Sequence, residues 1–466
     1  MLLKNSRHIH FIGIGGIGMS GIARILQDRG FKVSGSDLKP NNLTDAIGAG
    51  GGSIFTGHRA SNVPDDADMV VYSTCIKKDN PEMAKARGKK IPLLHRSDVL
   101  SELVNEKDGI AVSGAHGKTT TSALVSVLLE EAGFDPTVIV GGVMEYFGSN
   151  AKNGRGRLIV AEADESDATF TKLRPKYAIL TNIDTEHLEY YGNMGRIKKA
   201  SMDFMNNVRK DGCGIFCKDD PIISGMLKRC KSGFLTYGFS KDADLYAEDM
   251  RVKECEVSFR AIYKGRDLGV FAINIPGLHN AKNSLAAILL GLRLGIDADI
   301  IRRAMLLYKG AKRRFEIKAL INGAMVVEDY AHHPTEIEAT IRTCGGWPGR
   351  RLIGVFQPHR YTRTKFLKDK FAESLTGLDR LVLTDIYSAS ESPIKGVSSK
   401  SIYSRMVQSG YKNVSFLPKE KIAGYLCGIV REGDIVLVLG AGDIGDVSDE
   451  LVERLKRRGS LQRASV

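Results

Sequence analysis

Three stretches of the chain repeat one pattern, in which an apolar strand runs into a glycine-rich turn and then into a helical segment. The turns lie at residues 13–18, 114–117 and 440–445. Apolar runs at 158–164 and 177–183 also alternate with helical stretches. Strands that are joined through helices run parallel in their sheet. The sequence therefore predicts an α/β protein with parallel sheets and crossover helices.

The length of the chain, 466 residues, leaves room for about three domains. We expect boundaries near residues 107 and 309, which gives domains at 1–107, 108–309 and 310–466. Each of them holds a strand that ends in a glycine-rich turn. The shorter alternating strands at 240–275 are predicted to form a small antiparallel sheet.

The turn with the most chemical information reads GAHGKTTT, at residues 114–121. The general phosphate-binding pattern has four residues between its first glycine and its Gly-Lys pair, but only two separate Gly114 from Gly117. Lys118 is placed to meet the β- and γ-phosphates, and Thr119 or Thr120 can offer a hydroxyl to Mg²⁺. The helix that follows adds its N-terminal dipole. We interpret this stretch as a nucleotide-phosphate loop.

The first glycine turn fits the dinucleotide pattern G-x-G-x-x-G through Gly13, Gly15 and Gly18, with Asp37 about 20 residues further on. This context favours a diphosphate at a helix N-terminus, and it does not decide which nucleotide carries it. The turn at 440–445 has the same glycine spacing but no acidic partner at the usual distance. A packed turn without a ligand is the better interpretation there.

Polar residues follow several of the predicted strands, where ligands gather in a parallel sheet. Glu162 is the best candidate for Mg²⁺ among the carboxylates of AEADESD, the others of which could be solvated charges or helix caps. His187 follows the next strand and could bind a second metal ion, accept a proton or be structural. Asn280 and Asn283 share one face of a helix and could contact the nucleotide or cap the helix.

Basic and aromatic residues in the last third of the chain suit anionic groups. Either Arg313 or Arg314 could approach a transferring phosphate or belong to a basic surface. Arg360 and Arg363, three residues apart, suit a carboxylate. The segment DYAHHPTE adds Asp329, Tyr330, His332 and His333, although part of it is also an ordinary helix start.

Composition narrows the classes of protein. The net charge of +13 fits nucleic acid or anionic small substrates, and the scarcity of dense basic runs favours the small substrates. No apolar run approaches the roughly 18 residues of a membrane span, and the N-terminus lacks a signal-peptide pattern. The seven cysteines show no zinc-site spacing, as expected for reduced thiols in a cytoplasm.

Taken together, the motifs resemble the Mur ligases over nearly the whole chain. They occur in the order of that family: GIGGIGMSG, GAHGKTTT, EADESD, TNID followed by EH, HNAKN, RRFE, DYAHHPTE, PHRYTRT and LGAGDI. The short loop spacing is the one that this family uses. Ala115 departs from the pattern, because the family usually has threonine there. The resemblance implies three α/β domains: an N-terminal Rossmann-like domain for a UDP-sugar, a central P-loop domain for Mg·ATP, and a C-terminal Rossmann-like domain that closes over them.

The resemblance also implies roles for individual residues. For the UDP-sugar it implies Gly15, Gly16, Ile17, Gly18, Asp37 and Ser73. For ATP it implies Gly114, Ala115, His116, Gly117, Lys118, Thr119, Thr120, Asn280, Asn283, Arg314 and Asp329. For the metal ion, Mg²⁺ or Mn²⁺, it implies Thr119, Glu162 and His187. For the amino acid and the lactoyl group it implies Tyr330, His332, Arg360 and Arg363. The catalytic set would be Lys118, Glu162, His187 and Arg314.

His116 and the first glycine loop resemble the branch of the family that joins L-alanine to UDP-N-acetylmuramate through an acyl phosphate. The implied protein is a cytoplasmic monomer or homodimer that acts on these substrates and ATP, without nucleic acid or membrane partners. Three alternatives stay open at this point: a ligase that joins a peptide to the same sugar nucleotide, an NAD-dependent dehydrogenase, and a nucleotide-binding protein without enzymatic activity.

Overall fold

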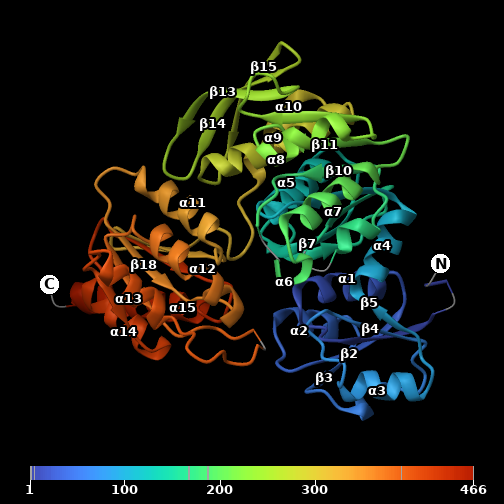
Figure 1. The fold of residues 1–466 in the computed structure, drawn as a ribbon, viewed down its shortest axis with the longest axis horizontal. Coiled ribbons are helices and arrows are strands. Elements are labelled where there is room, and N and C mark those ends of the chain that lie inside the picture. Colours follow the sequence, from blue (N-terminus) through green and yellow to red (C-terminus); the bar gives the residue numbers. More distant parts are fainter. Residues whose placement is uncertain (1–2, 5, 166–167, 186–187, 390, 465–466) are drawn as a thin grey trace. The chain divides into compact units, whose positions relative to one another are not determined.

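The computed structural model describes residues 3–4, 6–165, 168–185, 188–389 and 391–464, whose backbone forms two compact units. The first unit comprises residues 1–251, 258–274 and 280–309. The second comprises residues 252–257, 275–279 and 310–466. Figure 1 shows the elements of each unit along the chain.

The first unit begins with a parallel five-stranded sheet in the order β3-β2-β1-β4-β5. Its strands are β1 (His8–Ile12), β2 (Lys32–Asp37), β3 (Ser53–Thr56), β4 (Met69–Tyr72) and β5 (Leu93–His95). Its helices are α1 (Ile17–Asp28), α2 (Asn42–Ala49), α3 (Pro81–Gly88) and α4 (Arg96–Glu106). Every residue of β1 is buried, as expected for a central parallel strand covered on both faces. The predicted strand at 8–12 is confirmed.

A ten-stranded sheet follows, in the order β15-β14-β13-β12-β11-β10-β6-β9-β7-β8. Its strands are β6 (Asp108–Ser113), β7 (Thr137–Met144), β8 (Ser149–Lys152), β9 (Leu158–Glu162), β10 (Tyr177–Leu180), β11 (Cys213–Cys217), β12 (Phe234–Gly238), β13 (Leu245–Val252), β14 (Val257–Tyr263) and β15 (Arg266–Ile273). Its helices are α5 (Lys118–Glu131), α6 (Leu188–Tyr191), α7 (Met194–Asn206), α8 (Pro221–Met226), α9 (Leu278–Arg293) and α10 (Ala298–Leu307).

The small antiparallel sheet predicted at 240–275 is not a sheet of its own. Strands β13 to β15 extend the ten-stranded sheet, because β13 pairs with the edge of β12 at Tyr237 and Gly238. The alternating pattern identified these strands correctly, but it carries no information about which edge they join.

In the five-stranded sheet β1, and in the ten-stranded sheet β6, is the strand at which the strand order reverses. The chain leaves β1 for neighbours on either side, β2 and β4, and it leaves β6 for β9 and β10. In parallel sheets the carboxyl end of such a strand opens into a crevice, and ligands bind there. The turns at 13–18 and 114–117 follow these two strands directly, so the fold places both at ligand-binding positions.

The second unit holds a six-stranded sheet in the order β16-β17-β21-β18-β19-β20, with β16 antiparallel and the rest parallel. Its strands are β16 (Glu316–Ile321), β17 (Ala324–Asp329), β18 (Leu352–Phe356), β19 (Arg380–Leu383), β20 (Val414–Phe416) and β21 (Ile435–Leu439). Its helices are α11 (Pro334–Gly345), α12 (Tyr361–Ser374), α13 (Lys400–Gln408), α14 (Lys419–Ile429) and α15 (Gly445–Ala464). Short 3₁₀ helices elsewhere in the described part of the chain span Ala60–Asn62, Thr169–Lys172 and Leu227–Arg229.

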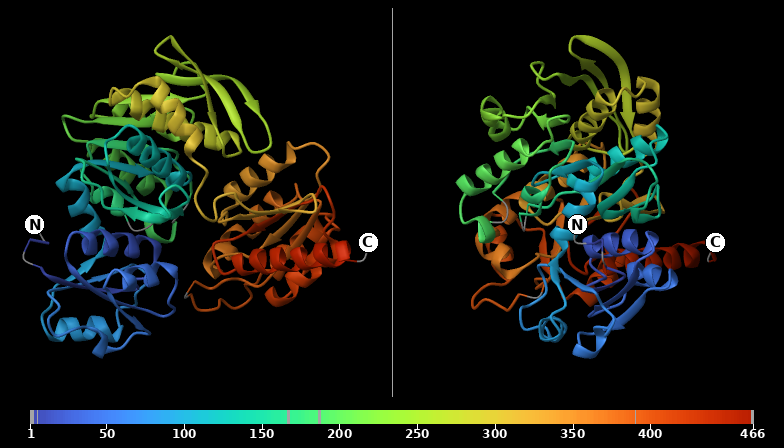
Figure 2. Two further views of the ribbon diagram at one scale, coloured as in Figure 1. Left: turned by 180° about the vertical axis from the view of Figure 1, so that it is seen from behind. Right: turned by 90° about the vertical axis from the view of Figure 1, so that its right-hand side faces the viewer.

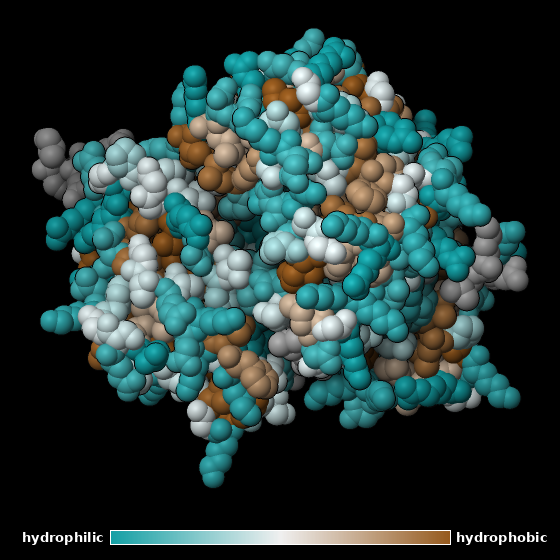
Figure 3. Space-filling model, turned by 45° about the horizontal axis from the view of Figure 1, so that its top comes forward, coloured by the Kyte–Doolittle hydropathy of each residue, from teal (hydrophilic) through white to brown (hydrophobic). Residues whose placement is uncertain are grey.

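Helices cover both faces of this sheet (Figure 2). One face packs Val327, Phe356 and Leu437 against α11 to α13, and the other packs Val326 and Val438 against α14 and α15. Alternate residues of the same strands thus build two cores. On the face seen in Figure 3, hydrophobic residues form small groups among hydrophilic ones. No helix in the described ranges is long and apolar enough to cross a membrane.

Candidate functional site

The backbone of the turn after β6 requires glycine at two positions. Gly114 has a φ of +130° and Gly117 a φ of +82°. A Cβ atom at Gly114 would lie 2.2 Å from Thr181 Oγ1, and one at Gly117 would lie 2.5 Å from Asn283 Oδ1. These separations leave no room for a side chain. The predicted residue Asn283 therefore borders the loop, and Asn280 lies one helical turn away, with Asn283 Nδ2 3.4 Å from its Oδ1.

Lys118 begins α5 and folds back over the loop. Its Nζ lies 2.6 Å from the carbonyl oxygen of Gly114, 3.0 Å from that of Ala115, and 2.8 Å from Glu165 Oε1. The ammonium group is thus held at the mouth of the loop by backbone dipoles and one buried carboxylate. A bound phosphate would offer the same cation a stronger set of oxygens. The sequence did not identify Glu165 as the partner of Lys118.

Thr119 and Glu162 meet across the first turn of α5. Thr119 Oγ1 donates to Glu162 Oε2 over 3.0 Å, and the backbone N–H of Gly141 donates to the same oxygen over 2.7 Å. A Cβ at Gly141 would stand 2.4 Å from this oxygen, so β7 approaches the carboxylate as closely as a glycine allows. A hydroxyl and a carboxylate beside a phosphate loop are the hard oxygen donors that Mg²⁺ takes, so this donor set fits the ion. His187, the third predicted ligand, lies outside the described residues.

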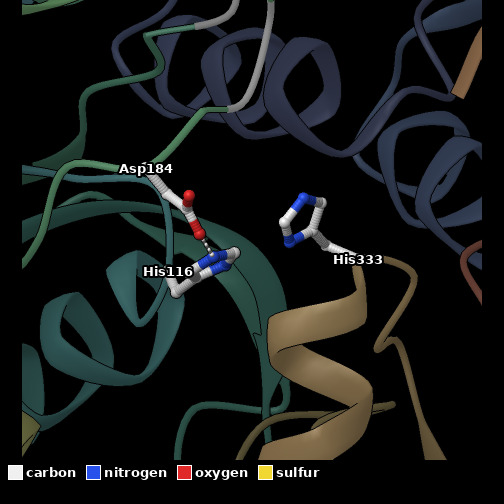
Figure 4. Close-up of side chains that lie close together, drawn as sticks. All are labelled: His116, Asp184 and His333. Carbon is white, nitrogen blue, oxygen red and sulfur yellow. Dashed lines mark hydrogen bonds and ion pairs between the residues drawn. The ribbon is translucent and has the colours of Figure 1, made fainter. Parts of the chain in front are cut away.

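The outer side of the loop is tied to the segment after β10. Asn182 Oδ1 accepts from the backbone N–H of His116 over 2.8 Å, and Asn182 Nδ2 donates to the His116 carbonyl over 2.9 Å. His116 Nε2 lies 3.2 Å from Asp184 Oδ2, which fixes the imidazole (Figure 4). The Ala115 N–H donates to the Asn182 carbonyl over 3.2 Å, a contact that needs no side chain at position 115. Asn182 lies two residues after the end of β10, and polar residues after a strand are the signal that could have identified it.

The turn after β1 is held by its own acidic residue. Asp37 Oδ2 accepts from the backbone N–H of Gly15 over 2.9 Å, and a Cβ at Gly15 would stand 2.9 Å from the same oxygen. Asn41 Nδ2 donates to the Gly15 carbonyl over 3.1 Å. Gly16 is the N-cap of α1 and has no side chain to cap the helix, so the helix N-terminus presents its own N–H groups. Asp37 acts on the loop here, and its predicted contact with the uridine stays a prediction.

Two further residues border this turn. A Cβ at Gly13 would lie 3.7 Å from Ser73 Oγ, so the predicted Ser73 does stand beside the loop. Arg96 Nη1 would stand 2.8 Å from a Cβ at Gly18, and its Nη2 donates to Asp164 Oδ2 over 3.1 Å. Arg96 thus reaches from the first glycine turn to the carboxylates after β9, a position that the sequence did not reveal.

The turn at 440–445 is filled by protein. Arg313 donates from Nη2 to the carbonyls of Gly440 and Gly442 over 2.9 and 2.8 Å, and from Nε to Glu328 Oε1 over 2.6 Å. A Cβ at Gly445 would stand 2.4 Å from the same glutamate oxygen. The prediction of a packed turn is confirmed, and Arg313 is committed to it. The other candidate, Arg314, has its Nη1 3.9 Å from Glu336 Oε1, and its approach to a phosphate stays a prediction.

Asp329 lies at the end of β17 and is buried. Its carboxylate accepts from the N–H of Ala331 over 2.8 Å, from the N–H of Phe315 over 3.2 Å, and from Thr340 Oγ1 over 3.2 Å. Burial raises the pKa of Asp329 to about 6, although the positive charge of Arg314 opposes that shift. Arg314 stacks its guanidinium over the Tyr330 ring, 4.9 Å from its centroid.

The residues predicted for the amino acid gather in the second unit. The rings of Tyr330 and His332 lie edge to face at 5.1 Å, and those of His332 and His359 at 5.7 Å. Arg363 Nη1 donates to His359 Nδ1 over 3.2 Å. Burial lowers the pKa of His359 to about 3, assisted by the charges of Arg363 and Arg360. A neutral imidazole thus orients one of the two arginines.

The imidazole of His332 is also neutral, because it is buried. Burial lowers its pKa well below the usual value of 6.5, outweighing the nearby Glu336. Its Nδ1 lies 2.9 Å from the Tyr330 carbonyl, which can only accept, so this nitrogen carries the proton. Tyr387, which sequence reasoning missed, stacks on His359 at 5.7 Å and 11°. It follows an apolar strand, the same signal that marked the other site residues.

Comparison with known proteins finds matches along nearly the whole chain. Three family models match: the Mur ligase family catalytic domain at residues 8–108, the Mur ligase middle domain at 112–291, and the Mur ligase glutamate ligase domain at 313–442. The chain is 45% identical over 454 residues to the UDP-N-acetylmuramate–L-alanine ligase of Trichlorobacter lovleyi, covering 97% of this chain and 99% of that protein. It is 46% identical over 445 residues to the ligase of the same name from Carboxydothermus hydrogenoformans, covering 95% and 96%.

Two solved structures have a fold similar to that of this chain. The UDP-N-acetylmuramate-alanine ligase of Thermotoga maritima has 31% identity, a TM-score of 0.84, and coverage of 97% of this chain and 99% of that one. A murein peptide ligase from Psychrobacter arcticus shares the fold at 23% identity, with a TM-score of 0.73 and coverage of 96% and 98%. The predicted three-domain α/β architecture is confirmed, and the chain belongs to the Mur ligase family.

Proposed function

We propose that this protein joins L-alanine to the lactoyl carboxylate of UDP-N-acetylmuramate in an ATP-dependent reaction that releases ADP and phosphate, a step in peptidoglycan precursor synthesis. The observation that carries the proposal is the cluster around the loop at 114–117, where Lys118 and the pair of Thr119 and Glu162 surround the start of α5. The relatives named above, at 45% and 46% identity over nearly their full lengths, supply the substrates.

The chemistry follows from the reactivity of a carboxylate. A carboxylate is a poor electrophile, so one of its oxygens attacks the γ-phosphorus of ATP and ADP departs, which leaves an acyl phosphate. Lys118 stabilises the charge on the phosphoryl oxygens during this transfer. When bound at Thr119 and Glu162, Mg²⁺ or Mn²⁺ would neutralise phosphate charge. The amine of alanine then attacks the acyl carbon, loses a proton, and phosphate leaves with the electrons of the broken carbon–oxygen bond.

The second unit would hold the amino acid. Arg360 and Arg363 suit its carboxylate, and the hydrogen bond from Arg363 to the neutral His359 keeps that guanidinium oriented. Arg314, in the same unit, is proposed to approach the transferring phosphate. We further propose the domains 1–107, 108–309 and 310–466 as the sugar-nucleotide, ATP and amino-acid domains. We also propose that the enzyme is cytoplasmic, where its nucleotide substrates are found, and that it is a monomer or homodimer, as the resemblance to the family implies.

One assay separates this function from its alternatives. Phosphate release from ATP is measured with Mg²⁺ and UDP-N-acetylmuramate, while L-alanine, glycine, L-serine or the tripeptide L-alanyl-γ-D-glutamyl-meso-diaminopimelate is varied. We expect release that depends on L-alanine. Release with the tripeptide alone would show the peptide ligase, and ATP binding without any acceptor-dependent release would show a non-enzymatic protein. The dehydrogenase alternative gives no role to Lys118 or Glu162. Binding of a nicotinamide nucleotide in a fluorescence titration would support it, and we expect none.

A further inference from the structure

The hairpin of β7 and β8 packs against α1, the helix that follows the first glycine turn, and forms hydrogen bonds with it. Asn150, on β8, is buried, and its Nδ2 donates to the carbonyl of Ile17 over 2.6 Å and to Ser20 Oγ over 3.1 Å. Ile17 is the first residue of α1. The side chain of Asn150 therefore holds the very end of the helix whose N–H groups face the predicted diphosphate.

The contact between helix and hairpin is close over a full turn of α1. A Cβ at Gly21 would lie 3.2 Å from Ile139 Cγ2 on β7 and 3.3 Å from Asn150 Nδ2. At the margin of the same contact, Arg24 Nη1 donates to Ser149 Oγ over 3.0 Å. A glycine at position 21 lets the helix lie against the hairpin, so their separation is set by packing as well as by the hydrogen bonds.

The same hairpin also positions the predicted metal carboxylate. Ile139 pairs with Ala151 on one side and with Ala161 on the other. Asn150 and Glu162 are the chain neighbours of these two partners. Two residues after Ile139, the N–H of Gly141 donates to Glu162 Oε2 over 2.7 Å. One short stretch of β7 therefore connects the helix of the first glycine turn to the carboxylate beside the second.

We propose that Asn150 is a positioning residue that fixes α1 on the β7–β8 hairpin and thereby sets the place of the sugar nucleotide relative to Glu162 and the phosphate to be transferred. The inference rests on the proposed function, which puts the sugar nucleotide at the first turn and ATP at the second. Phosphoryl transfer needs the carboxylate oxygen close to the γ-phosphorus and in line with the leaving group. A displacement of about 1 Å can cost about a hundredfold in rate, so a small shift of α1 is enough to be measured.

The test compares Asn150→Ala with Arg24→Ala, which removes a hydrogen bond at the margin of the same contact. For each, kcat and the KM of all three substrates are measured beside the parent protein. We expect Asn150→Ala to lower kcat/KM for UDP-N-acetylmuramate about five- to tenfold, the effect of losing its two hydrogen bonds to α1 with a small misplacement. The KM values for ATP and L-alanine should stay within about twofold, because the hydrogen bonds of Asn150 are to α1 and not to the loop at 114–117. Arg24→Ala should stay within about twofold throughout.

A second variant keeps the test decisive if Asn150→Ala does not fold. Gly21→Ala removes no hydrogen-bonding group but adds a methyl group against Ile139 and Asn150, and it should give the same pattern with a smaller loss, about threefold. A loss below twofold in a folded Asn150→Ala or Gly21→Ala variant would overturn the inference, as would an equal loss in Arg24→Ala. If the parent itself shows no alanine-dependent phosphate release, the proposed function fails, and the positioning role that rests on it fails with it. A parent that is active beside an unaffected variant contradicts the positioning role alone.

Discussion

The two glycine turns of the first unit share a backbone plan and differ in the side chains around them. Both follow a fully buried stretch of a central parallel strand and both open a helix. At the first turn, the acidic residue Asp37 faces inward and accepts a hydrogen bond from the loop itself. At the second, Lys118 lies over the loop, and Glu162 meets the hydroxyl of Thr119.

This difference in side chains indicates what each turn can do with a phosphate. A turn that offers backbone N–H groups but no lysine can bind a diphosphate that stays intact. A turn with an ammonium group, a hydroxyl and a carboxylate can stabilise a phosphate that moves. The glycine pattern alone therefore predicts binding, and the neighbouring side chains decide between binding and transfer. Four predictions test this contrast, in order of expected size.

Lys118→Ala removes the cation of the second turn and should lower kcat at least about a hundredfold, the scale of losing one charge-stabilising group. Binding of UDP-N-acetylmuramate, measured by calorimetry without ATP, should stay within about twofold of the parent. Lys228→Ala, which alters an exposed lysine, serves as the control. Near-normal turnover in the Lys118 variant would remove the distinction between the turns.

Glu162→Gln keeps the shape of the side chain and removes its charge. We expect the Mg²⁺ concentration for half-maximal rate to rise about ten- to a hundredfold, because carboxylate ligands are preferred over amides by a hard cation. A magnesium titration of the initial rate measures this. Glu145→Gln, at an exposed position in the β7–β8 turn, should leave the titration unchanged. An unchanged curve for Glu162→Gln would place the metal elsewhere.

Gly15→Ala tests the first turn in the opposite way. The new methyl group would stand 2.9 Å from Asp37 Oδ2, so either the loop or the Asp37 side chain that accepts its hydrogen bond must shift. The KM for the sugar nucleotide should rise about tenfold, the equivalent of about 1.4 kcal/mol, while the KM for ATP stays constant. Gly88→Ala, where a Cβ would meet nothing within 4 Å, is the matched control. Equal effects on both KM values would show that the turns are not independent.

The sheet that carries the first turn should be the more sensitive to mild acid. Burial is the main reason that the pKa of His8 is lowered from 6.5. The folded state then binds a proton less readily than the unfolded chain, so stability from this group is present above about pH 6.5 and is lost as the pH falls. Amide exchange in β1, corrected for intrinsic rates, should lose protection between pH 7.5 and 5.5, by at most about tenfold for this one group. His8→Gln should flatten this change, and β6, which has no histidine, should show less of it. Equal losses in both strands would contradict the assignment.

The sequence predicted which segments form helices and strands more fully than it predicted which of them lie side by side. The strand–glycine–helix pattern located β1, β6 and β21, and the rule that polar residues follow strand ends pointed to Glu162, which does lie beside the start of α5. This position could be predicted because a parallel sheet brings strand ends together by its topology.

The contacts that sequence reasoning missed depend on strand order and on side-chain direction. Glu165 and Asn182 reach the second turn only because β9 and β10 flank β6. The dinucleotide pattern includes Asp37 but does not say whether its carboxylate faces a ligand or the loop. The edge joined by β13 is likewise set by pairing across the sheet, which no local pattern encodes.

The most direct measurement follows one oxygen atom from the substrate of the first turn to the product of the second. UDP-N-acetylmuramate labelled with ¹⁸O in its lactoyl carboxylate is incubated with ATP, Mg²⁺ and L-alanine, and the released phosphate is analysed by mass spectrometry. If the second turn transfers phosphate onto a substrate held at the first, one labelled oxygen appears in each phosphate formed with the amide. Unlabelled phosphate, formed by attack of water on ATP, would contradict the account.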